Sequence, residues 1–222
     1  MLQVFDFEQG SPEWYAARLG IPTASEFATV MAKGKGGADS KTRRTYLLKL
    51  LGERITGEPM YSYSNEHMER GKIMEDEARD FYAFMTDNEP RRVGFIRNDY
   101  AGASPDSLIG NDGALEIKTK LAHLQMDVLL SGEVPSEHVA QLQGQLWVAE
   151  REWVDFVSYW PKTPPFIKRV YRDEKEIAKI AGAVEVFLNE LQAMLRQIDS
   201  GYSRSDDRAL HDQLRESLRG AA

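Results

Sequence analysis

The spacing of apolar residues predicts a chain in which helices flank a compact run of strands. Apolar positions recur every three to four residues along segments that we expect to be helices at 40–55, 65–86, 121–131, 136–149 and 173–198. A shorter helix is expected over 23–32, because Thr23 and Glu26 have the spacing of a capping box. Runs of β-branched and aromatic residues predict strands at 92–97, 153–160 and 166–171.

The same periodicity predicts which side of each helix is buried. In the 40–55 helix the apolar side consists of Tyr46, Leu47, Leu50, Leu51 and Ile55. In the 65–86 helix it consists of Ile73, Met74, Ala78, Phe81, Tyr82 and Met85. Helices before and after a group of strands favour an α/β fold with a mixed central β-sheet flanked by helices. With no internal repeat and no clear linker, we expect one domain over residues 1–222, with a polar tail that frays from about residue 200.

One predicted hairpin, residues 104–118, carries most of the chemical information. It reads Ser-Pro-Asp, then two short strands around a Gly-Asn-Asp-Gly turn, and it ends in Glu116, Ile117 and Lys118. Side chains two apart on a strand share a face, so Glu116 and Lys118 project together while Ile117 turns toward the core. Asp106 precedes the first strand, and two carboxylates therefore converge beside a lysine.

These three side chains fit a hydrolytic site for phosphodiesters. Two carboxylates supply oxygen ligands that suit Mg²⁺. A lysine beside them can orient or deprotonate a water molecule, or stabilise charge on a phosphate. This is the active-site pattern of the PD-(D/E)xK nucleases. The structural alternative is a solvated hairpin with an incidental cross-strand ion pair.

Other polar residues have two interpretations each. Glu75, on the helix before the strands, can complete a metal site or simply pair with Arg79 one turn later. Gln141 and Gln145 lie one helical turn apart, where a glutamine can contact the scissile phosphate or a water, although glutamines are ordinary on helix surfaces. Arg18 precedes another helix start, where it can form a phosphate pocket or cap its own helix.

Charge and composition narrow the possible partners. The 222 residues are 42% hydrophobic and 28% charged, as is usual for a soluble globular protein. The net charge of −7 argues against a broad basic surface for nucleic acid. An exception is the segment 33–44, in which five basic residues and three glycines accompany a single acid, Asp39, so that it resembles a mobile basic loop entering a helix.

The chain contains no cysteine, which excludes disulfides and thiolate metal sites and fits a reducing cytoplasm. It has no apolar run of the length that a membrane-spanning helix needs, and its N-terminus lacks a signal-peptide pattern. We therefore expect no association with membranes.

Five blocks, in order along residues 14–147, resemble one family. They are Trp-x3-Arg-Leu-Gly-x2-Thr-Ala-Ser-Glu, Gly-Lys-x2-Glu, Ser-Pro-Asp, Leu-Glu-Ile-Lys and Ala-Gln-x4-Leu-Trp. Both the residues and the spacing are similar to bacteriophage lambda exonuclease and its viral-recombinase relatives, a family of PD-(D/E)xK nucleases. Two positions depart from the family pattern: Thr119 replaces a cysteine, and His138 stands where relatives often carry tyrosine.

The resemblance implies a role for each matched residue. Asp106, Glu116 and the backbone carbonyl of Ile117 would hold a divalent metal, and Lys118 would position or activate the attacking water. Glu75 would help to hold a second metal or orient that water, and Gln141 would complete the site. The residues implied to bind the 5′-phosphate or the duplex are Arg18, Ser25 and Ser104 for the phosphate, Lys35 for the downstream duplex, and Met68 as a wedge between the strands.

The activity implied by the resemblance is a Mg²⁺-dependent, processive 5′→3′ exonuclease, with two metal ions per site and with Mn²⁺ as a substitute. It would act on double-stranded DNA ends, release mononucleotides and leave 3′ single strands for an annealing protein in phage recombination. The family assembles as a homotrimeric ring, here in the cytoplasm of a bacterial host. Two alternatives are an endonuclease on the same fold and a DNA-binding scaffold without catalysis.

Overall fold

The structure is a computed structural model that describes residues 1–34, 36, 40–60 and 66–202, with the backbone alone at 66–73 and 201–202. The predicted tail lies almost entirely outside these residues. No helix among the described residues is both long enough and apolar enough to span a membrane.

A mixed five-stranded sheet forms the centre of the molecule, as the apolar pattern predicts. Its strands, in spatial order, are β2 (Pro90–Arg91), β5 (Ser107–Ile109), β6 (Gly113–Thr119), β7 (Trp153–Tyr159) and β8 (Phe166–Tyr171). The β6–β7 pair is parallel and the other pairs are antiparallel. β6 is therefore the central strand, with neighbours of both kinds.

The predicted hairpin is confirmed as β5–β6, in which Ser107 lies opposite Leu115 and Ile109 opposite Gly113. Along β6 the side chains alternate between the two faces of the sheet. Leu115 and Ile117 pack in one apolar cluster with Ala78 and Tyr82, whereas Glu116 points to the other face.

A second, three-stranded sheet consists of β1 (Leu2–Phe5), β3 (Phe95–Asn98) and β4 (Ala101–Ala103). The single strand predicted over 92–97 is wrong, because the chain passes from β2 in one sheet to β3 in the other. Gly94 lies at the crossing, where its N–H donates to the Phe5 carbonyl at 2.9 Å. A Cβ at this position would lie 2.0 Å from the Phe7 carbonyl oxygen, so only glycine allows this approach.

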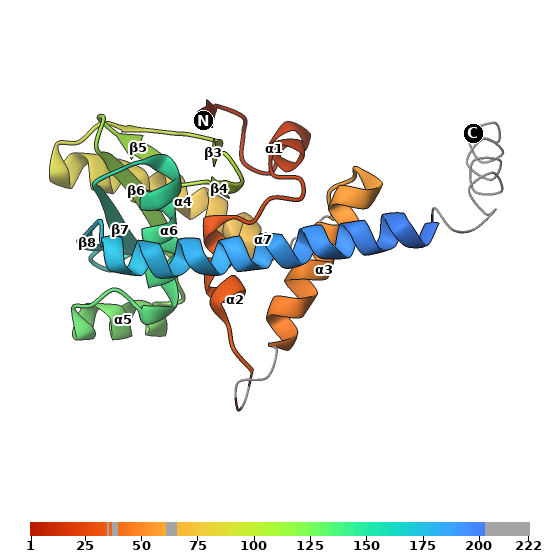
Figure 1. The fold of residues 1–222 in the computed structure, drawn as a ribbon. Helices are drawn as coiled ribbons and strands as arrows, with labels where there is room; N and C mark the ends of the chain where they lie inside the picture. The colour runs from red at the N-terminus through yellow and green to blue at the C-terminus, as the bar shows by residue number, and fades with distance from the viewer. Residues whose placement is uncertain (35, 37–39, 61–65, 203–222) are drawn as a thin grey trace.

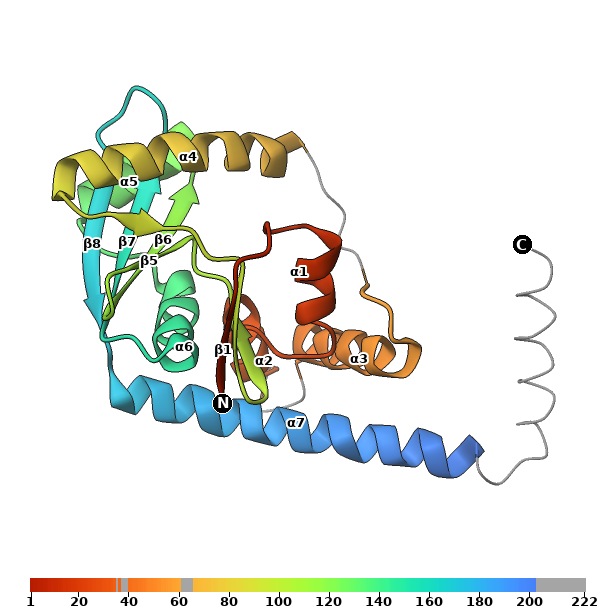
Figure 2. The same ribbon diagram turned by 90° about the horizontal axis from the view of Figure 1, so that it is seen from above.

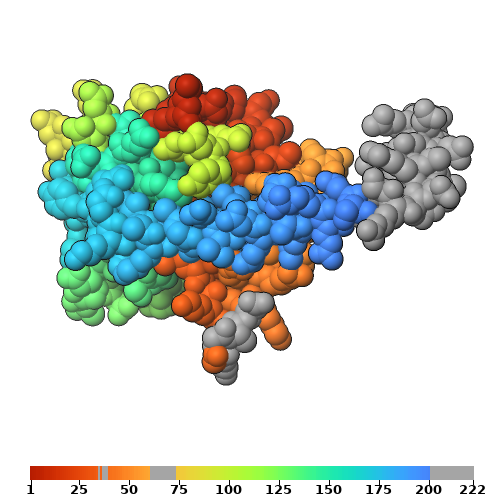
Figure 3. All heavy atoms as spheres, in the orientation of Figure 1, coloured from red at the N-terminus to blue at the C-terminus, as the bar shows by residue number. Residues whose placement is uncertain are grey.

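Helices cover both faces of the five-stranded sheet. They are α1 (Pro12–Ala17), α2 (Phe27–Met31), α3 (Lys41–Thr56), α4 (Glu66–Thr86), α5 (Ala122–Ser131), α6 (Val139–Ala149) and α7 (Glu174–Tyr202), with 3₁₀ turns η1 (Ala24–Glu26) and η3 (Ser136–His138). In Figure 2, α4 lies on one side of the sheet and α6 on the other. α7 runs outside α6 toward α3 (Figure 1) and crosses one face of the molecule as a continuous band (Figure 3).

Two apolar clusters fill these layers. The larger one joins α6 and the strands to α2, α3 and α7, and includes Phe27, Leu47, Leu142, Phe156 and Phe187. The smaller one lies between α4 and the opposite face of the sheet. Within the larger cluster, a Cβ at Gly144 of α6 would lie 2.4 Å from the Phe27 ring, so glycine permits α6 to approach η1 and α2 closely.

Three expectations about helices are wrong in detail. Thr23 makes no capping hydrogen bond, because its hydroxyl lies near Arg18 and Ser25 instead. Ile55 is 46% exposed, since it lies at the last turn of α3. Phe81 and Met85 are exposed as well, because the sheet covers only the side of α4 that carries Ala78 and Tyr82.

Candidate active site

The hairpin brings Asp106, Glu116 and Lys118 together, as their spacing predicts. The Asp106 N–H donates to the Leu115 carbonyl at 3.0 Å, and its Oδ2 accepts from the Ile117 N–H at 2.5 Å. Asp106 is thus tied to β6 through both its main chain and its carboxylate. The Ile117 side chain packs in the smaller apolar cluster, and its main-chain N–H faces the Asp106 carboxylate.

Helix α6 lies over the Glu116 side of β6 and supplies two amides. Gln141 Nε2 donates to Glu116 Oε1 at 2.6 Å, and Gln145 Nε2 donates to Glu116 Oε2 at 2.6 Å. The Lys118 ammonium lies 2.5 Å from Glu116 Oε1. Glu116 is only 2% exposed, so these three donors take the place of water around its carboxylate.

Negative charge is crowded at this point. Burial, together with the charges of Glu116 and Glu75, raises the pKa of Asp106 well above its ordinary range. Burial alone would lower the pKa of Lys118, but the charges of Glu116 and Asp106 outweigh it, and that pKa is raised. The raised pKa favours the ammonium form of Lys118, which can orient a water or stabilise an anion.

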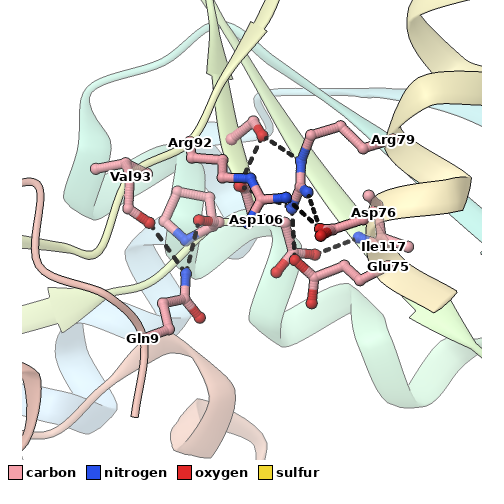
Figure 4. A network of polar contacts seen from close by, with 10 residues as sticks. Gln9, Glu75, Asp76, Arg79, Arg92, Val93, Asp106 and Ile117 are labelled. Carbon is pink, nitrogen blue, oxygen red and sulfur yellow. Dashed lines mark hydrogen bonds and ion pairs between the residues drawn. The ribbon is translucent and has the colours of Figure 1, made fainter. Parts of the chain in front are cut away.

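Glu75 reaches the site through a buried arginine. Arg79 Nη2 donates to Glu75 Oε1 at 2.5 Å, which is the pairing one turn apart that the structural alternative predicts. Arg79 is only 6% exposed, however, and its Nε donates to Ser107 Oγ at 3.0 Å. Figure 4 shows the guanidinium between α4 and the chain that enters β5, beside Asp106. The pair thus joins α4 to the β5–β6 hairpin.

A second group of side chains gathers around Arg18, the C-terminal cap of α1. Its guanidinium lies 3.7 Å from the Trp14 ring centroid, and Nη2 donates to Thr23 Oγ1 at 3.3 Å. Thr23 and Ser25 share a hydroxyl contact of 3.3 Å. Trp14 Nε1 donates to Ser104 Oγ at 3.0 Å, so the predicted phosphate ligands form one connected cluster.

Both groups line one cavity of about 220 Å³. Its lining consists of Gln9, Trp14, Arg18, Thr23, Ala24, Ser25, Ser104, Asp106, Glu116, Lys118, Gln141 and Gln145. Glu75 lies on the other side of Asp106, in an adjoining cavity of about 420 Å³ that Arg79 also lines. Of the remaining predicted residues, Lys35 lies outside the described residues, and Met68 belongs to the part of α4 that is described by its backbone alone.

Several lining residues were not predicted to act in the site. Trp14 and Thr23 lie inside the matched blocks, but a tryptophan and a threonine carry no charge to mark them as ligands. Gln145 had a signal, since it lies one turn after Gln141 on the same face of α6. Gln9 had none; its Nε2 donates to the Val93 and Pro105 carbonyls at 3.0 and 3.2 Å, just before Asp106 (Figure 4).

His138 is largely buried and lies near Lys120 and Lys118. Its ring centroid is 5.3 Å from that of Phe156. Burial, with the charges of Lys120 and Lys118, lowers the pKa of His138 to about 4. The ring is therefore neutral near neutral pH, as a tyrosine at this position would be.

The donor set has the chemistry that a hard divalent cation needs. Glu116 and Glu75 lie close enough to Asp106 for their charges to raise its pKa. A cation between the three carboxylates would relieve the repulsion among them. Among the described residues, no group of three or more acidic, histidine or cysteine side chains is placed so that it could hold a metal ion. Mg²⁺ does not need such a group, because it keeps several of its waters and uses one or two carboxylates.

Comparisons with known proteins agree with this geometry. Residues 13–152 match the YqaJ-like viral recombinase domain. The chain belongs to this family. It is also similar to the alkaline exonuclease LHK-Exo from Laribacter hongkongensis, at 33% identity and a TM-score of 0.79 over 87% of this chain and 99% of that one. A structure of LHK-Exo in complex with dAMP gives 35% identity and a TM-score of 0.80, with the same coverage.

The fold is shared more widely than the sequence. A phage-related exonuclease from Haemophilus somnus 129PT has a TM-score of 0.60 at 13% identity, over 80% of this chain and 96% of that one. No curated protein matches the chain. The predicted family and its PD-(D/E)xK nuclease fold are thus confirmed.

Proposed function

We propose that the protein is a Mg²⁺-dependent 5′→3′ exonuclease that degrades double-stranded DNA from its ends. Its exonuclease activity follows from family membership together with an intact Asp106, Glu116 and Lys118. The observation that carries the proposal is the shared cavity. Carboxylates suited to a metal and the Arg18 cluster suited to a phosphate line the same 220 Å³ space. Such a cavity can hold a terminal nucleotide by its 5′-phosphate while its 3′ linkage is cut.

The chain's own side chains divide the work. Asp106, Glu116 and the Ile117 carbonyl would hold the metal, with Glu75 serving a second ion. Bound metal would lower the pKa of a water molecule and offset charge on the phosphate. Lys118, as an ammonium beside Glu116, orients the water and stabilises the developing negative charge. Gln141 donates to Glu116 Oε1 and helps to fix the orientation of that buried carboxylate.

The 5′-phosphate would bind between Arg18, Ser25 and Ser104. A guanidinium makes strong, charge-assisted hydrogen bonds with phosphate. Arg18 is stacked on Trp14, which fixes the plane of its donors before a substrate arrives. Trp14 also holds Ser104 through its indole N–H, so that one aromatic residue positions both phosphate ligands.

The first experiment uses a duplex with one 5′-phosphorylated end and one 5′-hydroxyl end, digested with and without Mg²⁺ or Mn²⁺. We expect mononucleotides, faster loss of the phosphorylated strand, and no digestion after chelation. Arg18→Ala should slow digestion of the phosphorylated end about tenfold to a hundredfold, toward the hydroxyl-end rate. The matched control is Arg97→Ala, which removes an arginine of β3 outside the cavity and should keep the preference.

A covalently closed circular duplex separates this proposal from the endonuclease alternative, because an endonuclease needs no end. Cleavage of the circle at the rate of the linear duplex would contradict the proposal. A DNA-binding scaffold, the other alternative, would leave both substrates intact in the presence of metal.

We also propose a homotrimeric ring of the 25.2 kDa chain, with the basic segment 33–44 facing its channel. A net charge of −7 allows few phosphate contacts, and such a hold weakens as salt rises. Enclosure of the DNA by a closed ring explains processive digestion without tight binding. Light scattering that shows a monomer at assay concentration, together with digestion that stops when competitor DNA is added, would contradict the ring.

In this proposal residues 1–222 act as one domain, and the 3′ single strand passes to an annealing protein in the cytoplasm of a bacterial host. Two measurements would test that handover. One is co-purification of such a protein with the trimer. The other is loss of that association when the two proteins are expressed separately and mixed with excess single-stranded DNA.

A further inference from the structure

Glu116 is almost completely enclosed, and donors hold both of its carboxylate oxygens. Lys118 and Gln141 donate to Oε1 at 2.5 and 2.6 Å. Gln145 donates to Oε2 at 2.6 Å from the more buried side, since Gln145 is 1% exposed whereas Gln141 is half-buried. The carboxylate is therefore fixed from two directions by amides that lie one turn apart on α6.

A glutamine at position 145 of α6 costs the fold stability. Its Oε1 is buried and has no hydrogen-bond partner among the described residues. A buried amide oxygen without a partner destabilises a fold, and an apolar side chain of similar size would fill the space without that cost. The contact of its Nε2 with Glu116 is thus what a glutamine provides here and a methionine or leucine would not.

A neighbouring glutamine on the same helix shows the contrast. Gln143 is also buried, at 4% exposed. Its Nε2 donates to the Tyr171 carbonyl and its Oε1 accepts from the Asp173 N–H, both at 2.9 Å. Gln143 therefore satisfies both ends of its amide and joins α6 to the start of α7, far from any carboxylate of the site.

We propose that Gln145 is a positioning residue for the candidate metal site. By fixing Oε2 it prevents rotation of the Glu116 carboxylate, so that Oε1 remains with Lys118 and Gln141. Gln145 acts only through Glu116 and contacts no substrate. The proposal rests on the role of Glu116 as a metal ligand in the proposed function.

Two substitutions test the proposal by different means. Gln145→Met keeps the volume and removes the N–H donor, whereas Gln145→Asn keeps the amide and shortens its reach. Gln143→Met is the matched control. Binding of Mn²⁺ and Mg²⁺ to the DNA-free proteins is measured by calorimetry, and thermal unfolding is measured without metal.

We expect both Gln145 variants to bind metal about tenfold to a hundredfold more weakly. Gln145→Met should melt at or above the wild type, whereas Gln145→Asn, whose buried amide loses its contact with Glu116, should melt earlier. Gln143→Met should melt earlier and bind metal as the wild type does. If either folded Gln145 variant binds metal within twofold of the wild type, or if Gln143→Met weakens binding equally, the positioning role is wrong. A wild-type protein that binds no metal would instead refute the proposed function, and this inference with it.

Discussion

Two neighbouring strands of the central sheet each bury a carboxylate, and the two are treated in opposite ways. Asp155 on β7 lies opposite Leu115 of β6 and faces α4. Glu116, the next residue of β6, faces α6. Asp155 is 3% exposed and Glu116 is 2% exposed, so burial does not distinguish them. Their partners do.

Asp155 has partners that match its single charge. Both carboxylate oxygens accept from Arg169 at 2.8 Å, and Oδ2 also accepts from the Tyr82 hydroxyl at 2.6 Å. The Arg169 guanidinium in turn lies 3.5 Å from the Trp153 ring centroid. This side chain links β7, β8 and α4, and it stabilises the fold.

The carboxylates around Asp106 have a different set of partners. Lys118 contacts Glu116, and Arg79 pairs with Glu75 on α4. Burial, together with the charges of Glu116 and Glu75, still raises the pKa of Asp106. The same sheet thus carries Asp155, whose partners stabilise the fold. One residue along the neighbouring strand, it carries a group of carboxylates whose mutual repulsion reduces stability. Crowded carboxylates with a raised pKa are typical of functional sites.

Asp106→Asn should give the largest effect, and it tests most directly whether the two carboxylate regions differ. The amide can still accept from the Ile117 N–H, but it removes a ligand, so we expect digestion to fall at least about a thousandfold. Without metal, the variant should melt higher than the wild type, because one of the crowded charges is gone. A metal-free melting temperature below that of the wild type would contradict the electrostatic account.

Arg79→Met should reduce both the stability of the fold and the rate of digestion. It leaves Glu75 and Asp76 without the guanidinium and opens the contact with Ser107, so we expect a loss of about 3 kcal/mol in unfolding free energy and slower digestion by the folded fraction. The matched control is Arg92→Met, because Arg92 also pairs with Asp76 but is largely exposed. Denaturant unfolding and single-turnover digestion would measure the two effects. Equal losses in both variants would show that Arg79 is an ordinary surface partner.

Asp155→Asn should reduce stability and spare the chemistry. Breaking a buried ion pair is costly, but Arg169 is 38% exposed and can reach water, so we expect a loss of about 2 kcal/mol. Turnover per folded molecule and metal affinity should remain at wild-type values. A fall in metal affinity would show that the two carboxylate regions are coupled through the sheet.

The smallest effect concerns His138, which faces Lys118, Lys120, Glu137 and Glu116. Its pKa is lowered to about 4 in the fold from an ordinary 6.5, so the unfolded chain binds the proton more readily between these values. The wild type should therefore lose stability as pH falls from 6.5 toward 4, by about 1 to 2 kcal/mol. His138→Tyr should lose less over that window in denaturant unfolding. An identical pH dependence in both proteins would show that His138 is not the group responsible.

The sequence predicts the parts of this architecture that depend on local periodicity. The hairpin, β7, β8 and the long helices lie where apolar spacing and turn residues place them, because those signals act within a few residues. β1 and β4 were missed, since they are short and pair only with β3. The break at Gly94 depends on the approach of Phe7, 87 residues earlier, and no local pattern reports such a contact.

The candidate site divides in the same way. Asp106, Glu116 and Lys118 could be found because a charged pair two apart on a strand after a Pro-Asp dipeptide is an unusual pattern. Arg18 and Gln141 had two interpretations each from local pattern alone, and Ser25 and Ser104 were implied only by the resemblance to a family. Gln9 donates from its amide to two main-chain carbonyls, a contact that depends on the fold and that no local sequence pattern reveals.

Gly144 allows α6 to approach η1 closely, and this approach affects the length of the cavity between them. η1 carries Ser25, in the cluster around Arg18, and α6 carries Gln141, beside Glu116, so the separation of η1 and α6 affects the length of the cavity that both residues line. A bulkier residue at 144 would push against Phe27 and widen that interval. A side chain at position 144 would thus change the spacing between the two groups of residues that line the cavity.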